Sequence, residues 1–260
     1  MTAMTDTMPR RALVTGAGQR IGQTIATALG RAGWDVAVHY NRSAEGADAT
    51  VEAVRAAGRR AEPVRADLSR EDETAALVER AEAALGGTIG CLVNNAAIFE
   101  MDTVASATRQ TWDAHMEIDL RAPFVLIQAL TRRLPEDAQA CVVNMIDARV
   151  WNFTANFVSY TVAKSALWTL TQTMAMALAP RVRVNAVGPG PTLQDKHRTR
   201  EEFEALSASM PLGRGTTPEE VAEAVLYLID APAVTGQMIA LDGGQHLGWV
   251  RPGGARNPAG

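Results

Sequence analysis

The sequence TGAGQRIG, residues 15–22, follows a short apolar run and precedes an Ala-rich helical pattern, residues 21–31. Gly16, Gly18 and Gly22 give the backbone room to turn there and to approach a diphosphate at the helix N-terminus. Alone, the same glycines also fit a tight strand-to-helix turn that binds nothing. The candidate ligand contacts in this loop are Gly16, Gln19, Arg20 and Ile21.

Outward from this loop, short β-branched runs alternate with longer helical patterns along the chain. The strand-like runs are ALVTG, DVAVHY, AEPVRADL, GCLVNNA, ACVVNMI, RVRVNAVGPG and QMIALDGG. The helical patterns cover residues 21–31, 44–57, 72–85, 108–133 and 157–178 and a segment opened by Pro218. This alternation predicts the α/β class, with a Rossmann-type, doubly wound parallel sheet of seven strands and helices on both faces.

The pattern continues without an internal repeat, linker or change of composition, so we expect one domain over residues 10–248. Residues 1–9 are polar, and residues 249–260 repeat Gly and Pro without an apolar period. Both are expected to be flexible tails. The polar segment at about residues 193–211 follows a Gly/Pro turn, which favours a mobile flap over a pocket.

Composition and charge exclude several classes of function. A formal net charge of -4 with mixed signs provides no broad positive field for nucleic acid or for an anionic membrane. The chain lacks a signal-peptide pattern and any run of about 18 apolar residues, so we expect a cytoplasmic protein. Cys91 and Cys141 lie in apolar runs without other ligands at metal-binding spacing, which indicates reduced core thiols and no metal site.

The end of the second strand-like run indicates the nucleotide preference. An acidic residue there would bind the adenosine ribose of NAD, but the sequence reads HYNRS, residues 39–43. Arg42 can pair with a 2′-phosphate, and Ser43 and His39 can add donors, so NADPH is the predicted cofactor. Tyr40 is grouped with these contacts. Alternatively, Arg42 lies in a solvated turn and contacts no ligand.

Further candidate contacts stand at the carboxyl ends of later strands, the edge at which open α/β sheets bind ligands. Asp67 and Leu68 are expected to flank the adenine. The sequence NNAA, residues 94–97, is expected beside the nicotinamide ribose through Asn94 and Ala96, although asparagines also close turns. The remaining candidates, in the sequence NAVGPG, are Pro189 and Gly190.

Tyr160 and Lys164 stand four residues apart in YTVAK, so on a helix they project from one face. A lysine ammonium and an oxidised nicotinamide both favour phenolate, which would bring the tyrosine pKa toward a value useful near neutrality. Lys164 is also a candidate ligand of the nicotinamide ribose. An isolated pair at this spacing is often structural, so the interpretation depends on the dinucleotide motifs around it.

With TGAGQRIG, NNAA, YTVAK, NAVGPG and LDGG in this order, the chain resembles the short-chain dehydrogenase/reductase family over nearly its whole length. The resemblance implies that Tyr160 donates a proton and that Lys164 supports it. It also implies a homotetramer formed through long helices. An apolar stripe is consistent with that packing and equally with an intramolecular core; it comprises Phe124, Ile127, Leu130, Leu167, Leu170 and Met174.

Asp147 stands thirteen residues before Tyr160, where the family carries a carbonyl-binding Ser. Hydride delivery to a ketone creates an oxyanion, which an ionised carboxylate repels and a serine hydroxyl stabilises. Reduction of a C=N bond instead needs a proton on nitrogen, and a carboxyl group can bind amino groups while relaying a proton through Tyr160. The predicted catalytic residues are therefore Asp147, Tyr160 and Lys164.

Arg20, in place of the usual middle glycine, and the strand end HYNRS resemble the pteridine reductases of that family. The resemblance implies that Arg20 reaches the cofactor phosphates and the pterin, and that Phe99 stacks on the pterin. Phe99 otherwise is an ordinary apolar residue at a pocket rim. The implied substrate is a small pterin or dihydrofolate-like molecule, and the implied substrate-binding residues are Arg20, Phe99, Asp147 and Tyr160.

Two positions depart from the resemblance. Ala97 stands where pteridine reductases often carry Ser, and Asp119 stands where the wider family commonly has an Asn in its proton relay. Asp119 can accept from a relay water or can lie in a helix interior without a catalytic role. Two other functions stay open: reduction of a ketone or β-ketoacyl substrate, and NADPH sensing without turnover, against which the intact Tyr160 and Lys164 argue.

Overall fold

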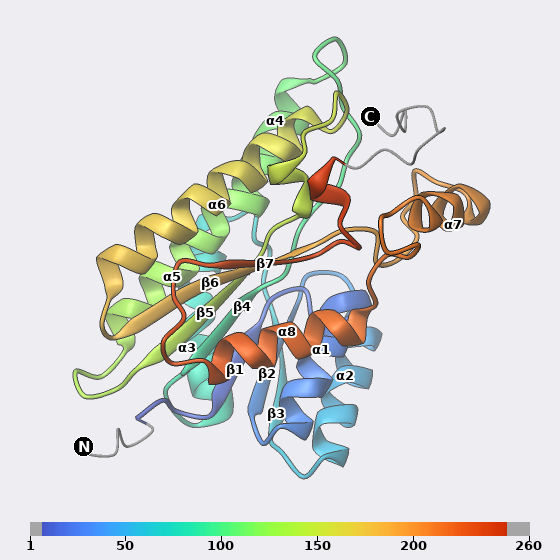
Figure 1. Ribbon diagram of the computed structural model, residues 1–260. Helices are drawn as coiled ribbons and strands as arrows, with labels where there is room; N and C mark the ends of the chain where they lie inside the picture. The colour runs from blue at the N-terminus through green and yellow to red at the C-terminus, as the bar shows by residue number, and fades with distance from the viewer. Residues whose placement is uncertain (1–6, 249–260) are drawn as a thin grey trace.

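The computed structural model describes residues 7–248 (Figure 1). Within them one parallel sheet has the strand order β3-β2-β1-β4-β5-β6-β7, which confirms the predicted seven-stranded doubly wound sheet. The strands are β1 (Arg11–Val14), β2 (Asp35–Tyr40), β3 (Ala61–Arg65), β4 (Cys91–Asn94), β5 (Ala140–Met145), β6 (Val182–Pro189) and β7 (Met238–Leu241). The strand order reverses between β1 and β4, where folds of this kind bind ligands. The tail predicted at residues 249–260 and most of that at 1–9 lie outside the described residues.

Helices cover both faces of the sheet, as predicted (Figure 1). They are α1 (Arg20–Arg31), α2 (Ala44–Ala56), α3 (Glu71–Leu85), α4 (Arg109–His115), α5 (Ala122–Arg133), α6 (Val158–Leu178), α7 (Arg200–Ala208) and α8 (Pro218–Asp230). One apolar core joins α1, α2 and α8 to one face, and a second joins α3, α5 and α6 to the other. Cys91 and Cys141 are buried in the sheet as free thiols, as the sequence predicts.

The helical region predicted at residues 108–133 contains a π-helical turn, Met116–Arg121, between α4 and α5. Such turns occur often at functional sites, because the extra residue redirects a side chain. Here the turn carries Asp119, which is fully buried. The predicted helical region is therefore present, and the π-helical turn inside it was not predicted.

The apolar stripe noted in the sequence packs within the chain. Ile127, Leu130, Leu167 and Met174 are buried in the cores, and Phe124 and Leu170 pack against them. The stripe is thus accounted for by intramolecular packing and does not itself indicate self-association. In residues 7–248 no helix has the length and apolarity needed to span a membrane.

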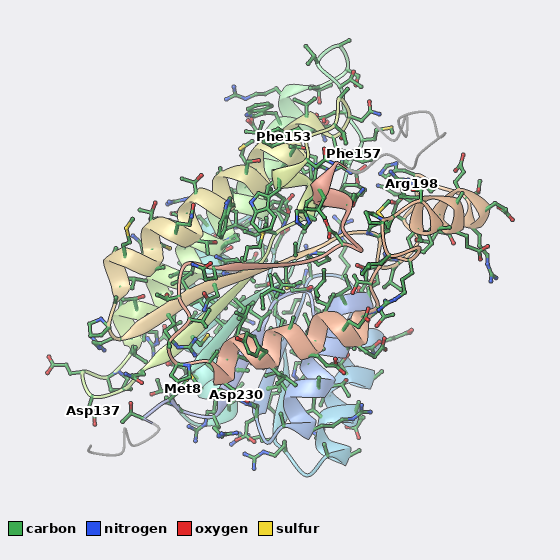
Figure 2. All side chains as sticks on the ribbon, viewed as in Figure 1. Met8, Asp137, Phe153, Phe157, Arg198 and Asp230 are labelled. Carbon is green, nitrogen blue, oxygen red and sulfur yellow. The ribbon has the colours of Figure 1, made fainter. Side chains whose placement is uncertain are left out.

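The segment proposed as a flap, residues 193–211, contains α7, a helix with no buried residue among the described ones. This helix was not predicted from the sequence, although Thr199 and Glu202 form a capping box at its start. Figure 2 shows Arg198 and Phe157 at one end of the molecule, opposite Asp137 and Met8. The flap therefore lies at the end where the strands finish.

Candidate active site

Two adjoining pockets open at the carboxyl ends of the strands. The loop pocket, of about 560 Å³, is lined by the Gly-rich loop, the end of β2 and residues 67–69. The tyrosine pocket, of about 610 Å³, is lined by Asp147, Tyr160 and the segment after β6. Both pockets share Gln19, Arg20 and Ile21, so a ligand in one borders a ligand in the other.

The Gly-rich loop is shaped by backbone contacts that leave no space for side chains. Gly16 has a φ of +63°, and a Cβ on it would lie 2.9 Å from the Cα of Ala96. A Cβ on Gly22 would lie 2.3 Å from the carbonyl oxygen of Gly16. The Thr15 hydroxyl accepts hydrogen bonds from the amides of Asn95 and Ala96, each at 2.9 Å. The loop is therefore held against the end of β4, as a close approach to a diphosphate requires.

Asn94 differs from its neighbour Asn95 in the direction of its side chain. It is the last residue of β4, and its side-chain amide donates to Asn144 Oδ1 at 2.8 Å inside the fold. The next residue, Asn95, lines both pockets and donates from Nδ2 to the Thr15 carbonyl oxygen. The Asn94 side chain thus points into the fold and Asn95 faces the pockets, because consecutive residues at a strand end point to opposite sides. A contact from Asn94 to the cofactor stays a prediction.

His39 lines the loop pocket but has no free donor for a phosphate. Its Nδ1 accepts from the Gly16 amide at 3.0 Å, so its Nε2 carries the proton and donates to the Ala66 carbonyl oxygen at 3.1 Å. Burial lowers the pKa of His39 to about 4, which keeps the ring neutral. The predicted donor role is replaced by a structural one: His39 fixes the Gly-rich loop.

The other predicted cofactor contacts lie in the two pockets. Those in the loop pocket are Tyr40, Arg42, Ser43, Asp67, Leu68 and Ala96. Those in the tyrosine pocket are Pro189, Gly190 and Lys164. Asp67 uses Oδ1 to accept from the amide and hydroxyl of Ser69, which lowers the pKa of its carboxyl group. Arg42 is exposed at the rim, with Ser43 beside it.

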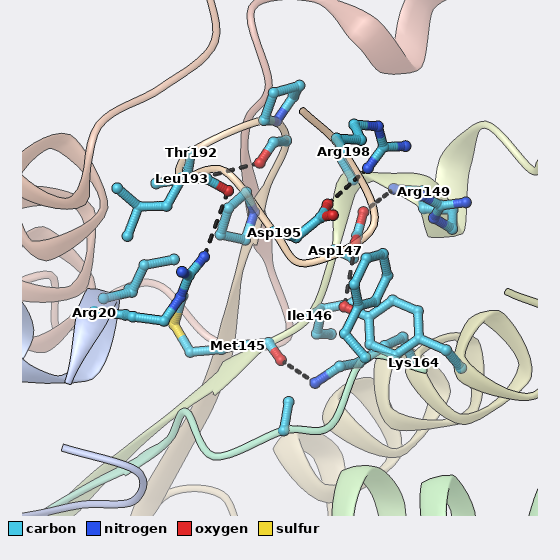
Figure 3. Close-up of a pocket in the computed structure, with 18 of the residues that line it drawn as sticks. Arg20, Met145, Ile146, Asp147, Arg149, Lys164, Thr192, Leu193, Asp195 and Arg198 are labelled. Atoms are coloured by element: carbon cyan, nitrogen blue, oxygen red, sulfur yellow. Dashed lines mark hydrogen bonds and ion pairs between the residues drawn. The ribbon is translucent and has the colours of Figure 1, made fainter. Parts of the chain in front are cut away.

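Asp147 and Tyr160 meet in the tyrosine pocket. Tyr160, on α6, donates its hydroxyl proton to Asp147 Oδ2 at 3.2 Å. Asp147 begins a 3₁₀ turn after β5, and its Oδ1 accepts from the Arg149 amide at 2.7 Å (Figure 3). The same turn thus holds the carboxyl group and aims it at the phenol.

Burial controls the ionisation of these groups. It raises the pKa of Tyr160 well above its ordinary value, and the carboxyl groups of Asp147 and Asp119 add to the effect. The Arg149 guanidinium acts in the opposite direction but does not outweigh the desolvation of the phenolate. The lower pKa expected from the sequence depends on an oxidised nicotinamide as well as on Lys164, and it stays a prediction. Burial also raises the pKa of Asp147, against which the Arg149 guanidinium acts. The phenol is therefore protonated at neutral pH and ready to donate.

Lys164 is buried one turn along α6 from Tyr160. Its ammonium donates to the Met145 carbonyl oxygen at 2.9 Å (Figure 3). Burial lowers the pKa of Lys164, while Asp119 and Asp147 act in the opposite direction. The two carboxyl groups therefore help to keep this buried lysine charged.

Asp119 projects from the π-helical turn toward this cluster. Its Oδ1 accepts from the Ile98 amide at 2.9 Å, and its Oδ2 is buried without a hydrogen-bond partner among residues 7–248. Burial raises the pKa of Asp119 to about 7, although Lys164 acts against this. Asp119 is therefore a second buried carboxyl group that interacts electrostatically with the Tyr160 and Lys164 pair.

Phe99 lines the tyrosine pocket, as predicted for a stacking residue. Its ring is stacked on Phe157, with centroids 4.1 Å apart and planes inclined by 7°. It also contacts the edge of Tyr160, with centroids 4.8 Å apart. Phe157 therefore covers one face of the Phe99 ring.

The segment after β6 crosses the tyrosine pocket and is held at both sides. Arg20, at a φ of +53°, donates to the Leu193 carbonyl oxygen at 3.4 Å (Figure 3). It also donates to the Gln194 carbonyl oxygen at 3.1 Å. On the far side His197 Nε2 donates to the Phe99 carbonyl oxygen at 2.9 Å, and Lys196 pairs with Glu100. These contacts span up to 174 residues of sequence, and none of them was predicted.

Comparisons with known proteins agree with this site. The family model described as enoyl-(acyl carrier protein) reductase matches residues 16–246. An oxidoreductase of Methylorubrum extorquens, named as uncharacterized, is 36% identical and covers 90% of this chain and 96% of its own. A 3-oxoacyl-(acyl-carrier-protein) reductase of Staphylococcus aureus is 31% identical and covers 92% of this chain and 99% of its own.

Among solved structures, FolM alternative dihydrofolate reductase 1 of Brucella suis in complex with NADP is 43% identical, with a TM-score of 0.90. The match covers 97% of this chain and 100% of that one. Because the family model matches residues 16–246 and relatives that are 31% and 36% identical cover 90% or more of the chain, the chain belongs to the short-chain dehydrogenase/reductase family.

Proposed function

We propose that this protein is an NADPH-dependent reductase of a C=N bond in a pterin or dihydrofolate-like molecule. The hydrogen bond from the Tyr160 hydroxyl to Asp147 carries the proposal, because it puts a carboxyl group where the reacting bond must lie. The Brucella suis protein, whose title names a dihydrofolate reductase with NADP, supports this substrate class.

The loop pocket fits the phosphates and adenosine of NADPH. Its glycines leave space for a diphosphate, and Arg42 with Ser43 stands where a carboxylate would favour NAD. Gln19, Arg20 and Ile21 border both pockets and would hold the centre of the cofactor. When bound, NADPH supplies the hydride.

Tyr160 supplies the proton in this mechanism. The C=N carbon gains the hydride, and the nitrogen gains the Tyr160 hydroxyl proton, so the bond becomes CH–NH. Lys164 lies near the phenolate that remains and stabilises it. Asp147 orients the amino groups of the substrate and, with its raised pKa, can return a proton to Tyr160.

Reduction of a ketone or β-ketoacyl group is the second candidate. It is favoured by the burial of Asp147, which raises its pKa and so promotes a protonated carboxyl group that can donate to a carbonyl oxygen. The Staphylococcus aureus relative is named for this reaction.

Steady-state turnover separates the candidates. Dihydrobiopterin, dihydrofolate, a simple ketone and a β-ketoacyl thioester are offered to the purified protein, and NADPH absorbance is followed. The proposal requires the highest kcat/KM for one of the two reduced pterins. A higher kcat/KM for the ketone or the thioester would assign the second candidate instead.

A further inference from the structure

Buried polar side chains from three separate elements meet behind the Tyr160 ring. Asp102 comes from the loop after β4, His115 ends α4, and Ser159 lies in the first turn of α6. Their exposed fractions are 1%, 0% and 0%. The Ser159 hydroxyl donates to Asp102 Oδ2, and His115 Nδ1 lies 2.7 Å from Ser159 Oγ. We call these three residues the DSH network.

The hydrogen bonds allow one arrangement of protons. The only hydroxyl proton of Ser159 goes to the Asp102 carboxylate, so Ser159 must accept from His115 Nδ1–H. His115 Nε2 then carries no proton and accepts from the Glu100 amide at 3.3 Å. Burial lowers the pKa of His115, which agrees with a neutral ring.

The DSH network supplies hydrogen-bond acceptors that the residues at the start of α6 do not provide themselves. Phe157, the N-cap residue, has a φ of +59° and gives no side-chain hydrogen bond, and the first turn holds no acidic residue. Asp102 compensates from 57 residues away: Oδ1 accepts from the Ser159 amide at 3.2 Å, and its carbonyl oxygen accepts from the Phe157 amide at 2.7 Å. A carboxylate is favourable at a helix N-terminus.

Two residues that line the tyrosine pocket, Tyr160 and Phe99, are connected to the DSH network. Tyr160 directly follows Ser159, and its ring lies edge-on to His115 with centroids 5.9 Å apart. Phe99 directly precedes Glu100, whose amide His115 binds. Three apolar side chains could also fill this volume. Buried polar atoms cost free energy unless each is paired, and apolar side chains would avoid that cost.

We propose that Asp102, Ser159 and His115 are positioning residues that hold the Tyr160 phenol and the Phe99 ring in the relative placement needed for proton transfer. The inference rests on the proposed function for the role of Phe99. It assigns no contact between the DSH network and the substrate: the network acts through the two residues that it places.

Ser159→Ala tests this role, with Ser165→Ala as the matched control on the same helix. Ser165 Oγ is buried without a hydrogen-bond partner among residues 7–248, so its loss should leave kcat and both KM values unchanged. Ser159→Ala is expected to lower kcat about 5- to 30-fold, as loss of a buried hydrogen bond at the site predicts. The KM for the pterin should rise, and the KM for NADPH should not, because other residues line the loop pocket.

His115→Phe supplies a second variant, which retains an aromatic ring but no ring nitrogen. Each single variant already lacks the hydrogen bond between Ser159 and His115. The kcat of the double variant should therefore lie only slightly below that of the less active single variant. If Ser159→Ala does not fold, His115→Phe is compared with Ser165→Ala by the same criteria. Melting temperatures are recorded for all variants. If the residues had a purely structural role, their substitution would lower the melting temperature and leave kcat unchanged.

Two results would overturn the inference. In the first, Ser159→Ala, or His115→Phe if it replaces that variant, has the same kcat and pterin KM as Ser165→Ala. In the second, the losses of kcat in the two single variants multiply in the double variant. Failure of the proposed function is separate. Wild-type protein that reduces no pterin removes that proposal, and the same variant ratios are then measured on whichever acceptor is reduced.

Discussion

The loop pocket and the tyrosine pocket share an edge of the sheet but are built in different ways. In the loop pocket, main-chain geometry dominates: glycines make room, and Thr15 and His39 bind backbone atoms. In the tyrosine pocket, buried titratable side chains dominate, and their ionisation depends on one another. The first arrangement suits a cofactor shared by many reductases, and the second selects the reaction.

The largest expected effect lies in the tyrosine pocket. Tyr160→Phe removes the donated proton, so turnover should fall by about 10²–10⁴-fold. The loop pocket is lined by other residues, so NADPH affinity, followed by cofactor fluorescence, should stay at the wild-type value. Wild-type turnover in this variant would remove Tyr160 from the mechanism. Wild-type protein inert toward every acceptor would favour the NADPH sensor.

Prediction from sequence succeeded where spacing alone determines placement. The seven-stranded doubly wound sheet, the Gly-rich turn and the meeting of Asp147 with Tyr160 follow from local pattern and from the order of motifs. The inward direction of the Asn94 side chain was not predicted, because a shift of one residue at a strand end exchanges the side chains that face the pocket. The burial that raises the pKa of Tyr160 was not predicted, because it comes from elements distant in the sequence.

Long-range contacts in the tyrosine pocket were beyond sequence analysis for a physical reason. His197 binds the Phe99 carbonyl oxygen from 98 residues away, and nothing in either local sequence encodes the partner. The π-helical turn that buries Asp119 likewise interrupts an otherwise regular helical pattern. In contrast, the signal for α7 was present in the spacing of Thr199 and Glu202.

A smaller effect concerns stability and the charge of Asp119. Its pKa in the folded protein, about 7, lies above the ordinary value of 3.8, so the carboxyl group weakens the fold progressively as the pH rises between these values. Asp119→Asn removes this destabilisation. Relative to the wild-type protein, the free energy of unfolding of the variant should be higher at about pH 8 than at about pH 4 by roughly 2–4 kcal/mol. Chemical denaturation at both pH values measures the difference. A stability change independent of pH would show that Asp119 ionises normally.

The smallest effect belongs to the loop pocket. Arg42 is exposed, so solvent weakens its attraction for a 2′-phosphate. Arg42→Ala should therefore raise the KM for NADPH by only about tenfold. NADH serves as the internal control, because it lacks the phosphate and its KM should not change. Equal changes for both cofactors would show that Arg42 supports the loop rather than the phosphate.

We propose that the carboxyl group of Asp147, beside the Tyr160 phenol, selects a nitrogen heterocycle over a ketone. Asp147→Ser tests it through the ratio of kcat/KM for dihydropterin to kcat/KM for a simple ketone. The serine variant is expected to lower this ratio by about 10²-fold or more, since a hydroxyl stabilises a developing oxyanion and a carboxylate does not. A ratio equal to that of the wild-type protein would contradict it.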